Sequence, residues 1–139
     1  MIQEKALERL TRKGIRPSAQ RLAIMDYLIH HPIHPTIEDV YNALCTKLPT
    51  LSKTTVYNTL RMLSEHQAAQ MITIDDHRVC YDGNIEPHVH FFCKKCGRVT
   101  DLFGEQPPRL AEPKTIDGNI VTEQQLYYKG ICRECAEAE

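Results

Sequence analysis

Residues 52–82 read SKTTVYNTLRMLSEHQAAQMITIDDHRVCYD, and the hydrophobic period changes within this stretch. Ser52 is a favourable N-cap, and the apolar residues after it recur at helical spacing, which predicts a helix that ends near Glu65. The apolar face of this helix consists of Val56, Leu60 and Leu63. Residues 71–74 and 78–81 lie on either side of a polar tip, which predicts a short β-hairpin.

Three further helices are predicted before this stretch. The first spans residues 3–13 and ends at Gly14, and the second begins at about Ser18 and ends near residue 30. Residues 36–39 resemble a capping box and begin the third. The apolar faces consist, in order, of Ala6, Leu7 and Leu10; Leu22, Met25, Leu28 and Ile29; and Ile37, Val40, Tyr41 and Leu44. Helices followed by a hairpin predict a winged helix-turn-helix whose fourth helix enters the major groove of DNA.

The polar face of the 52–65 helix is built from residue types that hydrogen-bond bases and phosphates, rather than from Glu/Lys pairs. These residues are Thr54, Asn58 and Arg61, flanked by Lys53 and Tyr57. Residues 1–64 carry nine Lys or Arg against five Asp or Glu (+4), whereas residues 65–139 carry eight against thirteen (−5). A basic first half favours nucleic-acid binding. The alternative is an ordinary amphipathic helix with a solvated face.

Two CxxC pairs, Cys93/Cys96 and Cys132/Cys135, lie 39 positions apart. Four thiolates from two tight turns match tetrahedral zinc, which would crosslink a segment too small to rely on its own core. The alternative is a pair of redox dithiols or a disulfide. A thioredoxin-type CxxC opens a helix after a strand in a βαβ unit, and we expect neither pair in that context. The remaining cysteines, Cys45 and Cys80, are expected to be buried as small hydrophobic residues.

A second cluster contains imidazole and carboxylate groups. His88 and His90 alternate, so on a strand both rings would face the same side. Asp82 lies across a turn, and Asp101 would be within reach if its predicted strand pairs with that of His90. His34 lies in the loop before the third predicted helix, so it would have to approach from the helical part of the chain. Such ligands suit Fe(II) or Mn(II), although a pair of histidines can also be simple surface residues.

The turn at Asp82-Gly83-Asn84 is the predicted domain boundary, giving domains 1–82 and 83–139 and an α+β chain. Five short strands of one small sheet are predicted beyond it: 90–93, 99–102, 115–116, 119–122 and 126–130. Residues 106–113 are rich in proline and could hold at most a turn or two of helix.

The composition and the N-terminus favour a cytoplasmic protein. No apolar run approaches the ~18 residues that span a membrane, and residues 1–5 do not lead into an apolar signal segment. Six cysteines in such a chain point to a reducing compartment, where CxxC pairs bind metal or do redox work.

The chain resembles the ferric uptake regulator (Fur) family of bacterial metal- and peroxide-responsive repressors over nearly its whole length. The resemblance rests on residues 16–21 (RPSAQR), 34–36 (HPT), 54–61 (TTVYNTLR) and 88–90 (HVH), and on both CxxC pairs. It implies a winged-helix DNA-binding domain hinged to an α/β dimerisation domain. It also implies DNA contacts for the motif residues Arg16, Gln20, Arg21, Lys53, Thr54, Thr55, Tyr57, Asn58 and Arg61.

Within the family the chain is most similar to the peroxide-responsive subgroup, whose regulatory site contains three His and two Asp. The counterparts here are His34, Asp82, His88, His90 and Asp101. Iron-sensing members tend to carry Glu at the positions of the two Asp residues, and often Arg at that of Asn58. The Pro-rich segment 106–113 replaces a longer helix of the dimerisation domain, so dimer geometry is not carried over.

The resemblance implies a homodimer that represses transcription at a palindromic DNA operator. One Fe(II) or Mn(II) ion would join the five ligands, close the hinge and fix the separation of the two recognition helices. With Fe(II), peroxide would oxidise His34 or His88, and DNA would be released. The nearest alternative is a family member that senses iron, zinc or manganese availability. An enzyme, either a metallohydrolase or a CxxC oxidoreductase, is disfavoured because no Glu is placed as a general base, as in an H-E-x-x-H helix.

Overall fold

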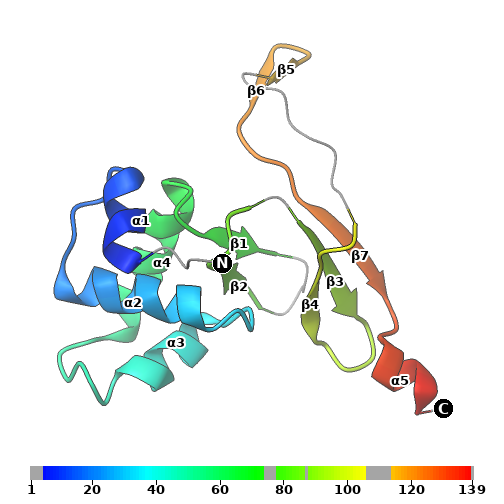
Figure 1. Ribbon diagram of the computed structural model, residues 1–139, viewed down its shortest axis with the longest axis horizontal. Coiled ribbons are helices and arrows are strands. Elements are labelled where there is room, and N and C mark those ends of the chain that lie inside the picture. Colours follow the sequence, from blue (N-terminus) through cyan, green and yellow to red (C-terminus); the bar gives the residue numbers. More distant parts are fainter. Residues whose placement is uncertain (1–4, 74–77, 87, 106–113, 139) are drawn as a thin grey trace. The chain divides into compact units, whose positions relative to one another are not determined.

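The computed structural model describes residues 5–73, 78–86, 88–105 and 114–138 (Figure 1). The chain divides into two compact units, Met1–Ile85 and Glu86–Glu139. This division lies three residues beyond the predicted boundary after Asp82. In the described part of the chain, no helix is long and apolar enough to cross a membrane.

Four helices make up most of the first unit: α1 (Ala6–Arg12), α2 (Ala19–His30), α3 (Ile37–Leu44) and α4 (Lys53–Glu65). The predicted starts of α2, α3 and α4 are confirmed by their caps, whereas α1 begins at Ala6 without a side-chain cap. The Ser18 hydroxyl accepts a hydrogen bond from the Arg21 backbone N–H, and the Ser52 hydroxyl does the same for Thr55. At α3 the Thr36 side chain and the Asp39 side chain cap each other's backbone N–H groups, which completes the predicted capping box.

The core of the first unit lies between these helices. Its fully buried members are Leu10, Ile24, Met25, Leu28, Val40, Val56, Leu60 and Leu63. The prediction that Leu7 shares the buried face of α1 was wrong, since this side chain is 53% exposed. Arg9 is buried instead, because its guanidinium finds backbone carbonyls to bind. The prediction for Cys80 is confirmed, whereas Cys45 is only half-buried.

The predicted hairpin follows α4 and completes a winged helix. Strands β1 (Gln70–Ile72) and β2 (Cys80–Asp82) pair antiparallel, with Gln70 opposite Asp82 and Ile72 opposite Cys80. Each strand is shorter than predicted and shifted by one residue or more. The predicted tip, residues 75–77, lies outside the described residues.

The second unit is built around β3 (Val89–Cys93). β4 (Val99–Leu102) pairs antiparallel on one side of it, and β7 (Leu126–Gly130) pairs parallel on the other. β5 (Lys114–Ile116) and β6 (Asn119–Val121) form a separate hairpin, so the prediction of a single sheet was wrong. Local patterns identify strands but not which strands pair. The segment 106–113 lies outside the described residues.

A short helix that the sequence did not predict, α5 (Arg133–Glu137), ends the described chain. Cys132 is its N-cap residue, and β7 precedes it. Cys132/Cys135 therefore opens a helix after a strand, which was not expected, but no strand follows α5 in the described residues to complete the βαβ unit of a thioredoxin-type motif. The redox alternative has to be judged from the positions of the four sulfurs.

Candidate functional site

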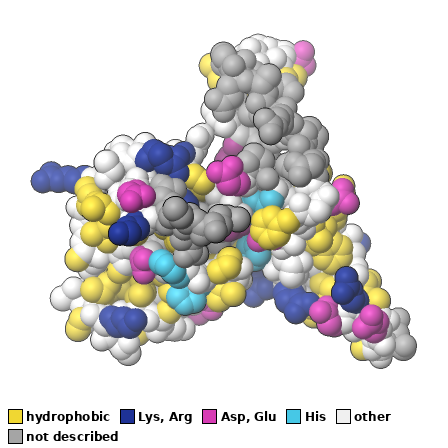
Figure 2. Space-filling view, viewed as in Figure 1, with side chains coloured by type: hydrophobic (Ala, Val, Ile, Leu, Met, Phe, Trp, Pro, Cys, Tyr) yellow, Lys and Arg dark blue, Asp and Glu magenta, His cyan; other side chains and the backbone are white. Residues whose placement is uncertain are grey.

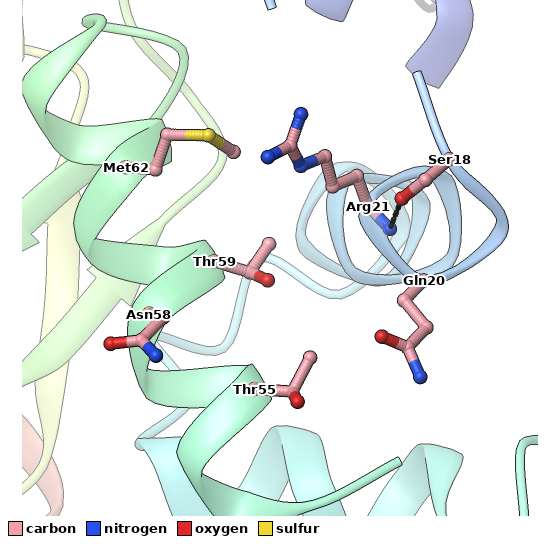
Figure 3. Close-up of a pocket in the computed structure, with 7 residues that line it drawn as sticks. All are labelled: Ser18, Gln20, Arg21, Thr55, Asn58, Thr59 and Met62. Atoms are coloured by element: carbon pink, nitrogen blue, oxygen red, sulfur yellow. Dashed lines mark hydrogen bonds between the residues drawn. The ribbon is translucent and has the colours of Figure 1, made fainter. Parts of the chain in front are cut away.

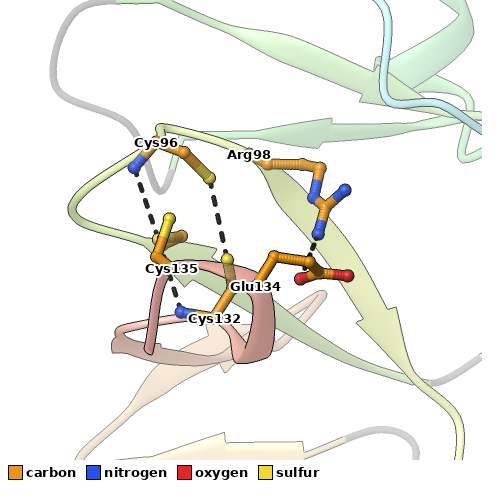
Figure 4. A network of polar contacts seen from close by, with 6 residues as sticks. Cys96, Arg98, Cys132, Glu134 and Cys135 are labelled. Carbon is orange, nitrogen blue, oxygen red and sulfur yellow. Dashed lines mark hydrogen bonds and ion pairs between the residues drawn. The ribbon is translucent and has the colours of Figure 1, made fainter. Parts of the chain in front are cut away.

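The four CxxC cysteines converge in the second unit. Their sulfurs all lie within 4.8 Å of one another, and the Cys93–Cys135 and Cys96–Cys132 sulfur pairs are each 3.8 Å apart (Figure 4). Sulfurs about 2.3 Å from a central zinc in a tetrahedron are about 3.8 Å apart. Each short pair joins one CxxC turn to the other, whereas a CxxC redox dithiol would pair the sulfurs within a turn, and 3.8 Å is well beyond the ~2.05 Å of a disulfide bond. The arrangement therefore fits one tetrahedral zinc ion.

The parallel pairing of β3 with β7 brings the two turns together. It places Cys93, the last residue of β3, opposite Gly130, and the chain then leads into Cys132 at the start of α5. Beside the cluster, Arg98 Nη2 donates to Glu134 Oε2 at 2.8 Å (Figure 4). This contact links the residue directly before β4 to α5. The candidate zinc ligands are thus positioned mainly by the register of the sheet, because the exposed ion pair contributes little.

Backbone N–H groups favour ionisation of one thiol in this cluster. The N–H groups of Cys96 and Cys132 each point at Cys93 Sγ from 3.4 Å and lower the pKa of Cys93 to about 6. The pKa of Cys135 is raised, mainly by hydrogen bonding with the Cys132 side chain and to a smaller extent by burial. Of Cys93 and Cys135, Cys93 is therefore the thiol that more readily becomes the thiolate that zinc requires.

Two histidines and an aspartate converge elsewhere in the second unit. His90 lies directly opposite Asp101 across the β3–β4 pair, which confirms the predicted strand pairing. The Nε2 atoms of His88 and His90 lie 3.1 Å and 3.4 Å from the same oxygen, Asp101 Oδ1. Ligand atoms about 2.1 Å from an ion in an octahedral site lie about 3.0 Å apart. The distance of each imidazole nitrogen from this oxygen therefore suits two ligands of one metal ion.

Two further candidate ligands, His34 and Asp82, lie in the first unit. His34 Nε2 is 3.6 Å from Asp82 Oδ2, and both side chains are buried. The Tyr81 backbone N–H donates to Pro35 O at 2.9 Å, which holds the loop of His34 against β2. Asp82 Oδ1 accepts the backbone N–H of Asn84, so the other carboxylate oxygen is directed at the imidazole.

His34 also has an unusual backbone conformation, with φ at 59°. Positive φ costs a non-glycine residue about 1–3 kcal/mol, and the residue before a proline normally adopts extended backbone. Such strain persists where the surrounding structure holds the residue, which is most common at functional sites. The geometry thus supports a ligand role for His34.

The predicted nucleic-acid residues gather on one side of the first unit. Lys53, Thr54, Tyr57, Asn58 and Arg61 are exposed on α4, and Thr55 is half-exposed. Lys53 and Arg61 form exposed ion pairs with Glu38 (3.3 Å) and Glu65 (3.6 Å). Such pairs contribute little, so both cations can exchange their partners for phosphate.

A cavity of about 380 Å³ joins the start of α2 to this face of α4 (Figure 3). Its lining residues are Ser18, Gln20, Arg21, Thr55, Asn58, Thr59 and Met62. Arg21 Nη1 donates to Arg16 O at 2.8 Å, which places Arg16 beside the same surface. Sequence reasoning missed three of the lining residues, Ser18, Thr59 and Met62. Helical spacing from Thr55 could have identified Thr59 and Met62.

On the face shown in Figure 2, the basic residues of the first unit do not form a dense patch. Figure 2 shows the Lys and Arg side chains spread over the helical unit among neutral and hydrophobic ones on the face in view. This distribution agrees with the modest charge of the first 64 residues. DNA binding would therefore depend on how several recognition helices are combined, as well as on charge.

Comparison with known proteins identifies the family. Residues 12–126 match the family model of the ferric uptake regulator family. The peroxide-responsive repressor PerR of Staphylococcus epidermidis is 34% identical over 138 residues, covering 96% of this chain and 90% of that protein. The structure is similar to that of the Campylobacter jejuni peroxide stress regulator (TM-score 0.65, 26% identity, covering 93% of this chain and 95% of that one). It is also similar in fold to the Helicobacter pylori ferric uptake regulator Fur (TM-score 0.71, 20% identity, covering 100% and 97%). The chain therefore belongs to the ferric uptake regulator family.

Proposed function

We propose that this protein is a metal-dependent transcriptional repressor that binds DNA as a homodimer and responds to hydrogen peroxide. The observation that carries the proposal is the division of a three-His, two-Asp ligand set into two prearranged groups. His34 and Asp82 meet in the winged-helix unit, and His88, His90 and Asp101 meet in the second unit. Imidazole and carboxylate ligands suit Fe(II) and Mn(II).

One ion bound by both groups would fix the orientation of the two units. In a dimer this would set the distance between the two α4 helices, so both could enter the major groove of a palindromic operator. Shifting such an equilibrium from about 1% to about 99% closed requires about 5.5 kcal/mol of differential binding. The ligands of the first unit, His34 and Asp82, would supply it because they contact the ion only in the closed form.

Zinc in the four-cysteine site has a separate role. It would crosslink the end of β3 to the start of α5 and hold the sheet on which His90 and Asp101 lie opposite each other. We propose that this zinc is structural, bound by reduced thiols in the cytoplasm.

Bound Fe(II) would supply the electron that cleaves peroxide. The side chain that would respond is His34 or His88, and an oxidised imidazole is a poorer ligand. With one ligand weakened, the ion would no longer hold the two units together, and the dimer would release DNA. Each event consumes a histidine, so the protein is a sensor rather than an enzyme. The names of the Staphylococcus epidermidis and Campylobacter jejuni relatives support a peroxide response.

The test combines oxidation with DNA binding. The zinc-containing protein is loaded with Fe(II) without oxygen, and a DNA duplex is selected with it from a random-sequence pool. Stoichiometric peroxide should then add one oxygen atom to His34 or His88 by peptide mass mapping and abolish the DNA gel shift. Protein loaded with Mn(II) should show neither change.

Unmodified histidines and a gel shift controlled only by metal concentration would contradict peroxide sensing. That result would instead indicate a metal-uptake regulator of the same family, sensing iron, zinc or manganese. Repeated turnover of a substrate, without selection of any DNA sequence, would contradict the repressor assignment itself.

A further inference from the structure

Arg9 is a charged residue in the interior of the winged-helix unit. Its side chain is 7% exposed, although it lies on α1 near the chain terminus. Burying a charge is costly unless hydrogen bonds replace the lost water. Arg9 Nη1 donates to Ala68 O at 2.9 Å and to Gly83 O at 2.8 Å, both in buried contacts. One guanidinium nitrogen thus binds two distant segments.

The two acceptors lie at places that matter for the proposed switch. Ala68 follows the end of α4, where its backbone N–H bonds back to Leu63 O. Gly83 is the residue directly after Asp82, the proposed metal ligand at the end of β2. Arg9 therefore connects the end of the DNA-contacting helix to the backbone beside that ligand.

Gly83 leaves no room for this backbone to move closer to α2. A Cβ atom added there would lie 2.6 Å from Leu28 O, closer than real Cβ contacts. The preceding residue, Asp82, pairs with Gln70 across the hairpin. Three contacts therefore restrain the backbone at Asp82 and Gly83: the pairing of Asp82 with Gln70, the close packing of Gly83 on α2, and the hydrogen bond from Arg9 to Gly83 O.

We infer that Arg9 is a positioning residue for metal binding, which fixes the backbone at Gly83 so that the Asp82 carboxylate faces His34. This inference rests on the proposed function, because it requires Asp82 to be a ligand of the regulatory metal. In this role Arg9 would act through its hydrogen bond to the Gly83 carbonyl and not as a ligand of the metal. Without the Arg9 hydrogen bonds, the Asp82 carboxylate would adopt a wider range of orientations. The affinity for the metal would then fall.

Three variants of the full-length, zinc-containing protein test this inference by calorimetric titration with Mn²⁺. Arg9→Met removes the donors at similar length, Arg9→Lys keeps the charge without the planar fork, and Gly83→Ala displaces the acceptor segment. Arg9→Met and Gly83→Ala should each weaken Mn²⁺ binding by about tenfold, and Arg9→Lys by less. Arg12→Met, an exposed position of the same helix, should bind Mn²⁺ like the unchanged protein. Wild-type Mn²⁺ affinity in both Arg9 variants would overturn the inference.

An Asp82→Ala background separates positioning from general stability. If Arg9 acts through Asp82, adding Arg9→Met to Asp82→Ala should weaken Mn²⁺ binding no further. An equal loss in both backgrounds would overturn the inference and show a structural role only. If Asp82→Ala itself leaves Mn²⁺ affinity unchanged, the assignment of Asp82 fails and the inference falls with it. Should Arg9→Met fail to fold, Arg9→Lys is used in its place in both backgrounds.

Discussion

Each short sulfur–sulfur contact of the second unit joins one CxxC turn to the other, so each thiol is needed to close the four-cysteine site. A zinc ion left with three thiolates would have a water molecule in place of the missing sulfur and would be bound less tightly. The four cysteines differ in exposure, from buried Cys93 to exposed Cys96. Their suitability as zinc ligands therefore depends on the positions of the other sulfurs and not on the exposure of each side chain.

Replacing Cys132 with alanine should remove the zinc. We expect the zinc content, measured by mass spectrometry of the purified protein, to fall from about one ion per chain to near zero. Amide hydrogen exchange in β3 and β7 should rise at the same time. Cys45→Ala is the matched control and should keep its zinc, because Cys45 lies outside the cluster. Full zinc content in Cys132→Ala would contradict the assignment.

Some residues of the candidate sites could be identified from the sequence and others could not. The cysteines follow from their spacing, and Asp101 follows from strand alternation once its strand pairs with that of His90. Arg9 could not be found in this way. A buried arginine has the same sequence pattern as an exposed one, and its acceptors, Ala68 and Gly83, lie far away in the chain.

Elements differ in how far local sequence determines them. α3 and α4 could be predicted because Thr36 and Ser52 cap their first turns and an apolar stripe follows. α5 was missed because five residues carry too little periodicity. The separation of the β5–β6 hairpin from the three-stranded sheet was missed for another reason. Which strands pair is decided by contacts between distant segments, here the parallel contact of β3 with β7.

The exposed face of α4 should contribute charge to DNA binding. Arg61→Ala is expected to weaken binding to every duplex sequence and to reduce the slope of log affinity against log salt by about one. Arg61 need only exchange its exposed pair with Glu65 for a phosphate. Fluorescence anisotropy at several salt concentrations measures the slope, with Arg12→Ala as the control. An unchanged slope would exclude a phosphate contact by Arg61.

At the scale of the whole molecule, the two units hold complementary parts of the proposed regulatory site. The first part offers two candidate ligands and the second three. A shared ion would be bound by more ligands, and so more tightly, when both units take part, which would couple metal binding to their arrangement and so to DNA. The positive φ of His34 is strained, which indicates that the surrounding first unit holds this residue in place.

Counting Mn²⁺ ions tests this claim most directly. Calorimetric titration of the zinc-containing protein should give one strongly bound Mn²⁺ per chain. His34→Ala and His90→Ala, one from each unit, should each lower the affinity for that ion by about a hundredfold or more. This is more than the loss of an outer-shell partner costs. His31→Ala, an exposed histidine, should change nothing. Two Mn²⁺ ions per chain, with each variant losing a different one, or unchanged affinity in His34→Ala, would contradict a single ion held by both units.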